Sequence, residues 1–196
     1  MHPSRSVPDV QEKRHTWNET ISGINAEHLV FLDESGINTN LTRLYAHTLR
    51  WERAVDSAPL NTPITTTVLS SIRLDGTTIS TTYQGGTTAE RFREYIETLL
   101  IPSLKKEDLV VMDNMRSHHA KIVTEYLDKA EISYIYLPPY SPDLNPIEKM
   151  WSKMKAFLRK QKVRVASKLS EAVKRALETV SHSDCVGWFH ACGYVR

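Results

Sequence analysis

The 196-residue sequence contains only two cysteines, Cys185 and Cys192, both near its end. By count they are too few for a disulfide framework or a structural zinc site, and we expect them to be small, buried, reduced thiols. Long apolar runs are also missing, since none approaches the roughly 20 residues that cross a bilayer. The polar start lacks the apolar core of a signal peptide. These absences predict a cytoplasmic protein.

A strong net charge is absent as well. The 25 lysines and arginines nearly balance 23 acidic residues, which leaves a formal net charge of +2. The distribution is uneven, because residues 149–170 contain no acid but many cations: Lys149, Lys153, Lys155, Arg159, Lys160, Lys162, Arg164 and Lys168. Such a run fits a DNA phosphate backbone, but a solvated surface has the same composition. Charge alone leaves both interpretations open.

The chain length suits one domain with short appendages. Residues 1–26 are polar and contain Pro3 and Pro8, so we expect a linker or the tail of an upstream region. Residues 27–196 should form the domain itself. Hydrophobic residues make up 40% of the chain, an ordinary value for a protein with a buried core.

Strand and helix patterns alternate along the domain. Short apolar runs predict strands at 28–32, 109–112 and 133–137, and Asp75-Gly76 predicts a hairpin turn within 63–83. Helical spacing covers 88–104, 120–130, the residues after Asn145, and 168–180. The aromatic segment 184–194 should dock on the core. This order predicts an α/β fold with a mixed sheet and helices on both of its faces.

Three acids occupy suggestive positions. Asp33 and Asp113 each follow a short apolar strand, and Glu148 lies in the first turn of the helix after a proline-rich connector. Converging carboxylates without His or Cys ligands suit a hard cation such as Mg²⁺ or Mn²⁺. Two such ions about 4 Å apart would serve in-line displacement at phosphorus.

Each acid also has a purely structural interpretation. Asp33 could be a turn residue, and Asp113-Asn114 could form an Asx turn. Asn145 is a good N-cap for the next helix, and together with Glu148 it makes a capping-box-like pattern that needs no catalysis. The arrangement therefore indicates a site without naming its reaction.

Longer motifs in the sequence carry more specific information about the reaction. One long motif reads Leu137-Pro138-Pro139-Tyr140-Ser141-Pro142-Asp143-Leu144-Asn145-Pro146-Ile147-Glu148 and is followed by Trp151 and Lys155. This motif resembles the signature of the mariner superfamily of DDE transposases, in its bacterial insertion-sequence branch. The segment 31–36 resembles that family's first acidic motif, and 111–114 with His118 resembles its second. The 34 residues between Asp113 and Glu148 match the spacing typical of the family.

The resemblance implies a ribonuclease-H-like fold in which Asp33, Asp113 and Glu148 bind two Mg²⁺ (or Mn²⁺) ions. It implies endonuclease cleavage at transposon ends, followed by attack of the freed 3′-hydroxyl on target DNA, by a homo-oligomer assembled on DNA. Asn114, His118 and Asn145 match further motif positions, and we expect them to support the ligands or position the substrate. The expected DNA contacts are Lys155 and Arg159, which share the helical flank of Glu148, together with Lys149 and Lys153.

Such transposases normally carry an N-terminal helix-turn-helix region that reads the transposon ends. Nothing before Asn25 is long enough to fold that way, so we expect an upstream partner or a frameshift fusion to supply it. Two alternatives remain open: an inactive transposase remnant, and a nuclease of the ribonuclease-H-like superfamily.

Overall fold

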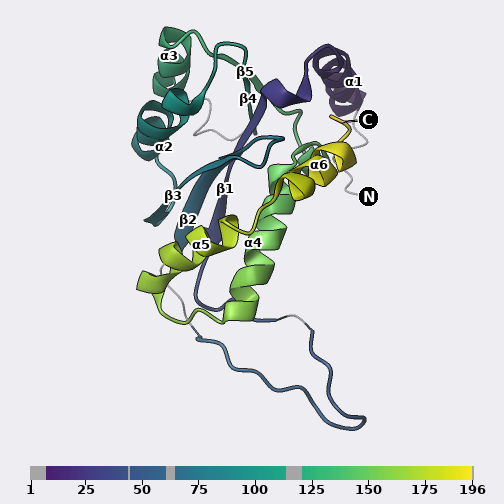
Figure 1. Cartoon of the computed structure of the whole chain (residues 1–196), viewed down its shortest axis with the longest axis vertical. Coiled ribbons are helices and arrows are strands. Elements are labelled where there is room, and N and C mark those ends of the chain that lie inside the picture. Colours follow the sequence, from purple (N-terminus) through teal and green to yellow (C-terminus); the bar gives the residue numbers. More distant parts are fainter. Residues whose placement is uncertain (1–7, 44, 61–64, 114–120, 196) are drawn as a thin grey trace.

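A five-stranded mixed sheet forms the centre of the protein. The computed structural model describes residues 8–43, 45–60, 65–113 and 121–195 (Figure 1). The strands follow the order β3-β2-β1-β4-β5, with bounds β1 Leu29–Ile37, β2 Thr66–Ile72, β3 Thr78–Gln84, β4 Leu109–Met112 and β5 Ser133–Tyr136. β1, β2 and β3 pair antiparallel, whereas β1, β4 and β5 pair parallel. The predicted mixed sheet and hairpin are confirmed.

Helices cover both faces of this sheet, as predicted (Figure 1). Alternate residues of β1 point to opposite faces, so Phe31 joins one core cluster and Leu32 the other. One face packs against α1 Pro8–Ser22, α4 Ile147–Gln161, α5 Leu169–Leu177 and α6 His182–Ala191. The other packs against α2 Ala89–Tyr95, its continuation Ile96–Ser103, and α3 Lys121–Lys129.

The helix predicted over 88–104 is not uniform. Thr88 caps α2, and its side chain accepts a hydrogen bond from the Arg91 backbone N–H at 3.4 Å. The chain then widens into a π-helical turn over Ile96–Leu100 and tightens into a 3₁₀ turn over Ile101–Ser103. Pro102 supplies a physical reason, because it lacks the N–H that a continuing α-helix would bond.

Residues 1–26, expected to be a linker or the tail of an upstream region, contain a helix that packs on the domain. Residues 8–22 form helix α1, which buries Val10, Trp17 and Ile21 against the domain. These three apolar side chains fall on one helical face, but the surrounding polar residues hide the stripe in the sequence. A 3₁₀ turn, Ala26–His28, then leads directly into β1. Helix α1 is therefore part of the packed domain.

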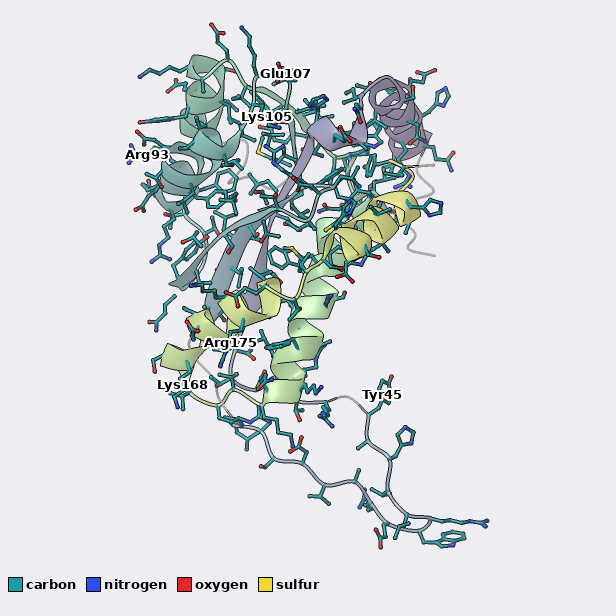
Figure 2. The ribbon with its side chains drawn as sticks, in the orientation of Figure 1. Tyr45, Arg93, Lys105, Glu107, Lys168 and Arg175 are labelled. Atoms are coloured by element: carbon teal, nitrogen blue, oxygen red, sulfur yellow. The ribbon has the colours of Figure 1, made fainter. Side chains whose placement is uncertain are left out.

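A long loop between β1 and β2 runs away from the body of the protein (Figure 1). Its described residues, 38–43, 45–60 and 65, form no helix or strand. They expose several large side chains, among them Tyr45 at 89% and Trp51 at 91%; Tyr45 is labelled in Figure 2. Two cations of the acid-free run hold the base of the loop. Lys162 binds Asp56 at 2.8 Å, and Arg164 donates to backbone carbonyls of the loop.

The C-terminal segment docks on the core as predicted. Ser181 and Asp184 form a capping box at the start of α6. The Phe31 ring of β1 lies 5.4 Å from Phe189 and 4.9 Å from Tyr194, measured between ring centroids. Cys185 and Cys192 are buried free thiols. None of the described helices combines the length and hydrophobicity needed to span a bilayer.

The packing of α1 yields a stability prediction. Trp17 is 6% exposed, so Trp17→Ala should lower the free energy of unfolding by about 3–5 kcal/mol. Thr16→Ala, on the exposed side of the same helix, serves as the control and should change it by less than about 0.5 kcal/mol. Urea denaturation of both variants measures the difference. Equal stabilities would mean that α1 does not pack on the domain.

Candidate active site

The register of the sheet brings two of the predicted acids together. The parallel pairing of β1 with β4 ends at Leu32 and Met112, so Asp33 and Asp113 occupy the next position on neighbouring strands. Both positions belong to the face that α4 covers. One expectation is corrected, because Asp33 does not end its strand. β1 continues to Ile37 by pairing with β2, and Asp33 lies opposite Ser70 in that pairing.

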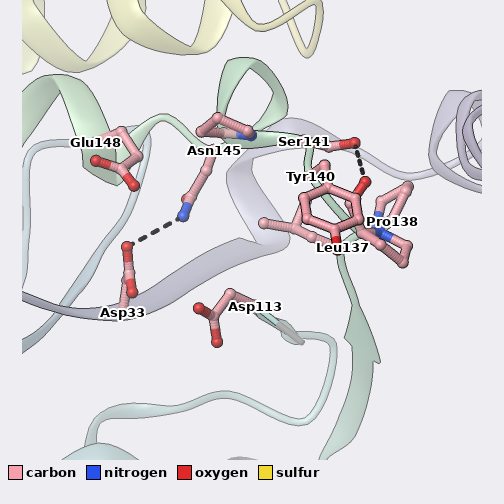
Figure 3. Close-up of a pocket in the computed structure, with 10 residues that line it drawn as sticks. Asp33, Asp113, Leu137, Pro138, Tyr140, Ser141, Asn145 and Glu148 are labelled. Atoms are coloured by element: carbon pink, nitrogen blue, oxygen red, sulfur yellow. Dashed lines mark hydrogen bonds between the residues drawn. The ribbon is translucent and has the colours of Figure 1, made fainter. Parts of the chain in front are cut away.

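Glu148 reaches the same place from the first turn of α4. Helix α4 is held against the sheet by a buried stripe comprising Ile147, Met150, Trp151, Met154 and Leu158. The connector from β5 to α4 folds back beside the two strands, and together these elements enclose a pocket of about 420 Å³. Figure 3 shows the carboxyl groups of Asp33, Asp113 and Glu148 around this pocket.

Asp33 is the most constrained of the three. Its side chain is 5% exposed, and its Oδ2 accepts two hydrogen bonds, from Asn145 Nδ2 at 3.3 Å and from Trp151 Nε1 at 3.3 Å. The other oxygen, Oδ1, accepts the Glu34 backbone N–H at 2.7 Å. Both oxygens are therefore oriented by the protein.

The contact from Asn145 overturns a sequence expectation. The N-cap of α4 is Pro146, and no side-chain hydrogen bond caps that helix end. The Asn145 amide instead reaches across to Asp33, as Figure 3 shows. The capping-box interpretation of Asn145 and Glu148 is wrong, and Glu148 keeps its carboxylate at the pocket.

Comparison with known proteins adds family information to this geometry. The family described as DDE superfamily endonuclease matches residues 28–170. The chain belongs to the DDE endonuclease superfamily. Comparison with curated protein sequences gave no match.

Solved structures resemble this DDE endonuclease in fold. A pre-cleavage Mos1 transpososome superposes with a TM-score of 0.77 at 18% identity, covering 93% of this chain and 59% of that one. The Mos1 transposase catalytic domain with raltegravir and Mg gives a TM-score of 0.70 at 16% identity, covering 93% and 89%. The predicted ribonuclease-H-like fold is confirmed. The chain spans about three fifths of the transposase in the first complex.

Trp151 is a site residue whose role the sequence did not reveal. Its position, three residues after Glu148, placed it in the apolar stripe of the helix, and it is indeed 2% exposed. Its indole N–H nevertheless bonds Asp33. A buried tryptophan usually finds a partner for that N–H, but only the structure shows which one. Asn114 and His118, the other predicted supporting residues, lie outside the described residues.

The predicted DNA-binding cations divide into two groups on α4. Lys153 forms an ion pair with Asp184 at 2.5 Å and donates to the Thr179 carbonyl, so it faces α6 and not the pocket. Lys149 lies on the same side, near Cys192 at the end of α6. Burial raises the pKa of the Cys192 thiol, and the positive charge of Lys149 acts to lower it. Lys155 and Arg159 share the flank of Glu148 and are partly exposed. Of the four predicted DNA-binding cations, Lys155 and Arg159 are thus the two that share the flank of Glu148.

Electrostatics at the site centre on Asp33. Burial, together with repulsion from the nearby Asp113 and Glu148, raises the pKa of this carboxyl to about 7, although the hydrogen bonds from the Glu34 N–H and from Trp151 act to lower it. Within the described part of the chain, no three acidic, histidine or cysteine side chains are gathered into a ready-made metal-ligand cluster. The carboxylates share a pocket and repel one another. This chemistry fits a cation that would draw them together.

The raised pKa predicts a specific pH dependence. Between the ordinary value of 3.8 and about 7, folded Asp33 keeps a proton that the unfolded chain has released. The contribution of this proton to the free energy of unfolding is fully present below pH 3.8. It is lost as the pH rises through about 7, a change on the order of 4 kcal/mol. In metal-free buffer, the wild type should lose stability over this range relative to Asp33→Asn, so the difference between their melting temperatures should change with pH. Parallel curves for the two proteins would contradict the assignment.

Proposed function

We propose that this chain is the catalytic domain of a transposase, which cuts DNA at transposon ends and joins the freed ends to target DNA. The observation that carries the proposal is the meeting of Asp33, Asp113 and Glu148 at one pocket, in a DDE endonuclease with a mariner-like fold. The solved relatives include Mos1 complexes with transposon ends and a strand transfer complex.

We further propose that the three carboxylates hold two Mg²⁺ or Mn²⁺ ions. The solved Mos1 relatives include complexes with Mg and with Mn. When bound, such ions polarise the scissile phosphate and stabilise the charge of the attacking and leaving oxygens. The all-carboxylate donor set suits hard cations, and the crowding at Asp33 supplies the driving force.

The residues of the chain prepare the pocket for this chemistry. Asn145 and Trp151 fix one Asp33 oxygen, and the Glu34 N–H fixes the other, so the carboxylate keeps its direction when it loses its proton. Glu148 lies in the first turn of α4, where the helix dipole favours a negative charge. Asn114 and His118 are proposed to assist substrate positioning.

Two displacements at phosphorus make up the proposed reaction. In the first, a water oxygen bonds to the phosphorus of a DNA strand, the bond from phosphorus to the 3′-oxygen breaks, and the leaving oxygen becomes a 3′-hydroxyl. In the second, that hydroxyl attacks a target phosphodiester and displaces another 3′-oxygen. A nuclease of the same fold would stop after the first step, so the joined product distinguishes the alternatives.

DNA is the proposed substrate and partner. Lys155 and Arg159 lie on the flank of α4 that carries Glu148, and we propose that they contact phosphates beside the scissile bond. The upstream helix-turn-helix region and a homo-oligomer assembled on DNA remain proposals drawn from the family resemblance.

The acidic triad can be tested by substitution. Asp33→Asn, Asp113→Asn and Glu148→Gln should each reduce Mg²⁺- or Mn²⁺-dependent cleavage of transposon-end DNA by more than ~100-fold, because groups that merely support a metal ligand already contribute about 10- to 100-fold. Glu107→Gln, at the opposite end of β4 (Figure 2), is the matched control and should cleave normally. Full cleavage by any triad variant would remove that residue from the catalytic set.

The DNA-binding flank can be tested by salt dependence. Replacing both Lys155 and Arg159 by Ala should weaken DNA binding and reduce the slope of log affinity against log salt by about 2, because two phosphate contacts are lost. The double variant Lys106→Ala/Lys129→Ala removes the same charge from exposed sites at the opposite end of β4. That control should leave the slope unchanged. Equal slopes in both double variants would mean that Lys155 and Arg159 are ordinary solvent-exposed cations that do not contact DNA phosphates.

A further inference from the structure

The wall of the catalytic pocket is an irregular segment between β5 and α4. Residues 137–145 connect β5 to α4, and this connector supplies most of the residues that line the pocket beside the acids. It is tied to β4 through the Leu137 N–H, which donates to the Met112 carbonyl at 2.8 Å. Its own turn is closed by Leu144 and Asn145, whose N–H groups donate at 3.0 and 3.2 Å. Side chains from other elements add to these bonds.

Arg14 of helix α1 binds two residues of the connector. Its Nη1 donates to Ser141 Oγ at 2.6 Å, and its Nη2 donates to Asp143 Oδ2 at 2.7 Å. A further bond from Nη1 to Asp143 Oδ1 at 3.3 Å makes the ion pair bidentate. The guanidinium is planar and presents its donors in a fixed fork, so it sets the direction as well as the distance of both partners.

The contact continues into the backbone of the connector. Ser141 is 5% exposed, and its hydroxyl donates to the Pro139 carbonyl at 3.2 Å. This bond spans Tyr140, whose φ of 57° lies in the left-handed region that residues other than glycine seldom adopt. Such conformations persist only where the surroundings hold them. The bonds of Arg14 to Ser141 and of Ser141 to Pro139 contribute to that support.

The same connector delivers the amide that orients the buried acid. Asn145 directly follows the 3₁₀ turn Pro142–Leu144, which contains Asp143. Its Nδ2 donates to Asp33 Oδ2. A continuous series of contacts thus runs from α1 through Arg14, the connector and Asn145 to Asp33.

We propose that Arg14 is a positioning residue for the catalytic pocket. It locks the connector in the conformation that aims Asn145 at Asp33, and it couples the position of helix α1 to the geometry of the acidic site. The catalytic consequence rests on the proposed function, whereas the structural coupling does not. Any displacement of α1 would reach the pocket wall through this side chain.

The solvent exposure of the Arg14–Asp143 ion pair distinguishes a positioning role from a contribution to global stability. The Arg14 and Asp143 side chains are 26% and 44% exposed, and ion pairs this accessible contribute little to global stability. Arg14→Met should therefore leave the melting temperature nearly unchanged. Its effect should appear locally, in the connector and at the metal site.

Hydrogen–deuterium exchange tests the coupling directly. In Arg14→Met, the Leu144 and Asn145 amides should exchange about tenfold faster, as expected for the loss of hydrogen bonds to a charged group. Manganese titration should show about tenfold weaker binding, since a group supporting a metal ligand contributes about that much. Asp143→Asn, which keeps the shape of the partner, should give a smaller change in the same direction.

His15→Gln is the matched control, because His15 lies on the same helix and pairs only with Glu19 among the described residues. It should change neither exchange nor manganese binding. Restored exchange in the double variant Arg14→Asp/Asp143→Arg would support the ion pair itself. Unchanged exchange and manganese binding in Arg14→Met would overturn the proposal. If the wild type cleaves no DNA, the proposed function fails, and the exchange data still decide the coupling.

Discussion

Repulsion among carboxylates at one buried pocket is the constraint on which the rest of the site depends. Asp33 lies almost fully buried beside Asp113 and Glu148, and burial with this repulsion raises its pKa to about 7. A group in that state is held by a proton, by donors from the protein or by a cation. The donors from Asn145, Trp151 and the Glu34 N–H are present in the structure. They orient the acid without neutralising its neighbours, and the site thereby favours a cation.

The fold explains how three acids far apart in sequence reach one place. Parallel pairing of β1 and β4 fixes Asp33 and Asp113 in equivalent positions, and the buried stripe of α4 fixes Glu148 above them. The connector closes the remaining side. Both ends of the described chain hold it, since Arg14 binds Ser141 and the Tyr194 hydroxyl donates to the Leu144 carbonyl at 2.6 Å.

The sequence predicted the elements whose patterns are local. Apolar runs located β4 and β5, the Asp75-Gly76 turn located the hairpin, and the connector motif placed Glu148 at the start of α4. Contacts between residues far apart in the chain could not be predicted from the sequence. Asn145 has the chemistry of a helix cap, and only the approach of β1 makes Asp33 its partner. Helix α1 was missed because three buried side chains among many polar ones give a weak pattern. The ion pair of Lys153 could not be predicted because its partner Asp184 is 31 residues away.

Proton-linked metal binding tests the central claim most directly. Manganese should be titrated calorimetrically into the metal-free protein at about pH 6 and about pH 8, in two buffers of different ionisation enthalpy. If repulsion at Asp33 drives cation binding, the affinity should be higher at the upper pH, and binding at the lower pH should release close to one proton per protein. Asp33→Asn should lose both the tight binding and the proton release. Wild-type affinity that is independent of pH, with no proton released, would contradict the account.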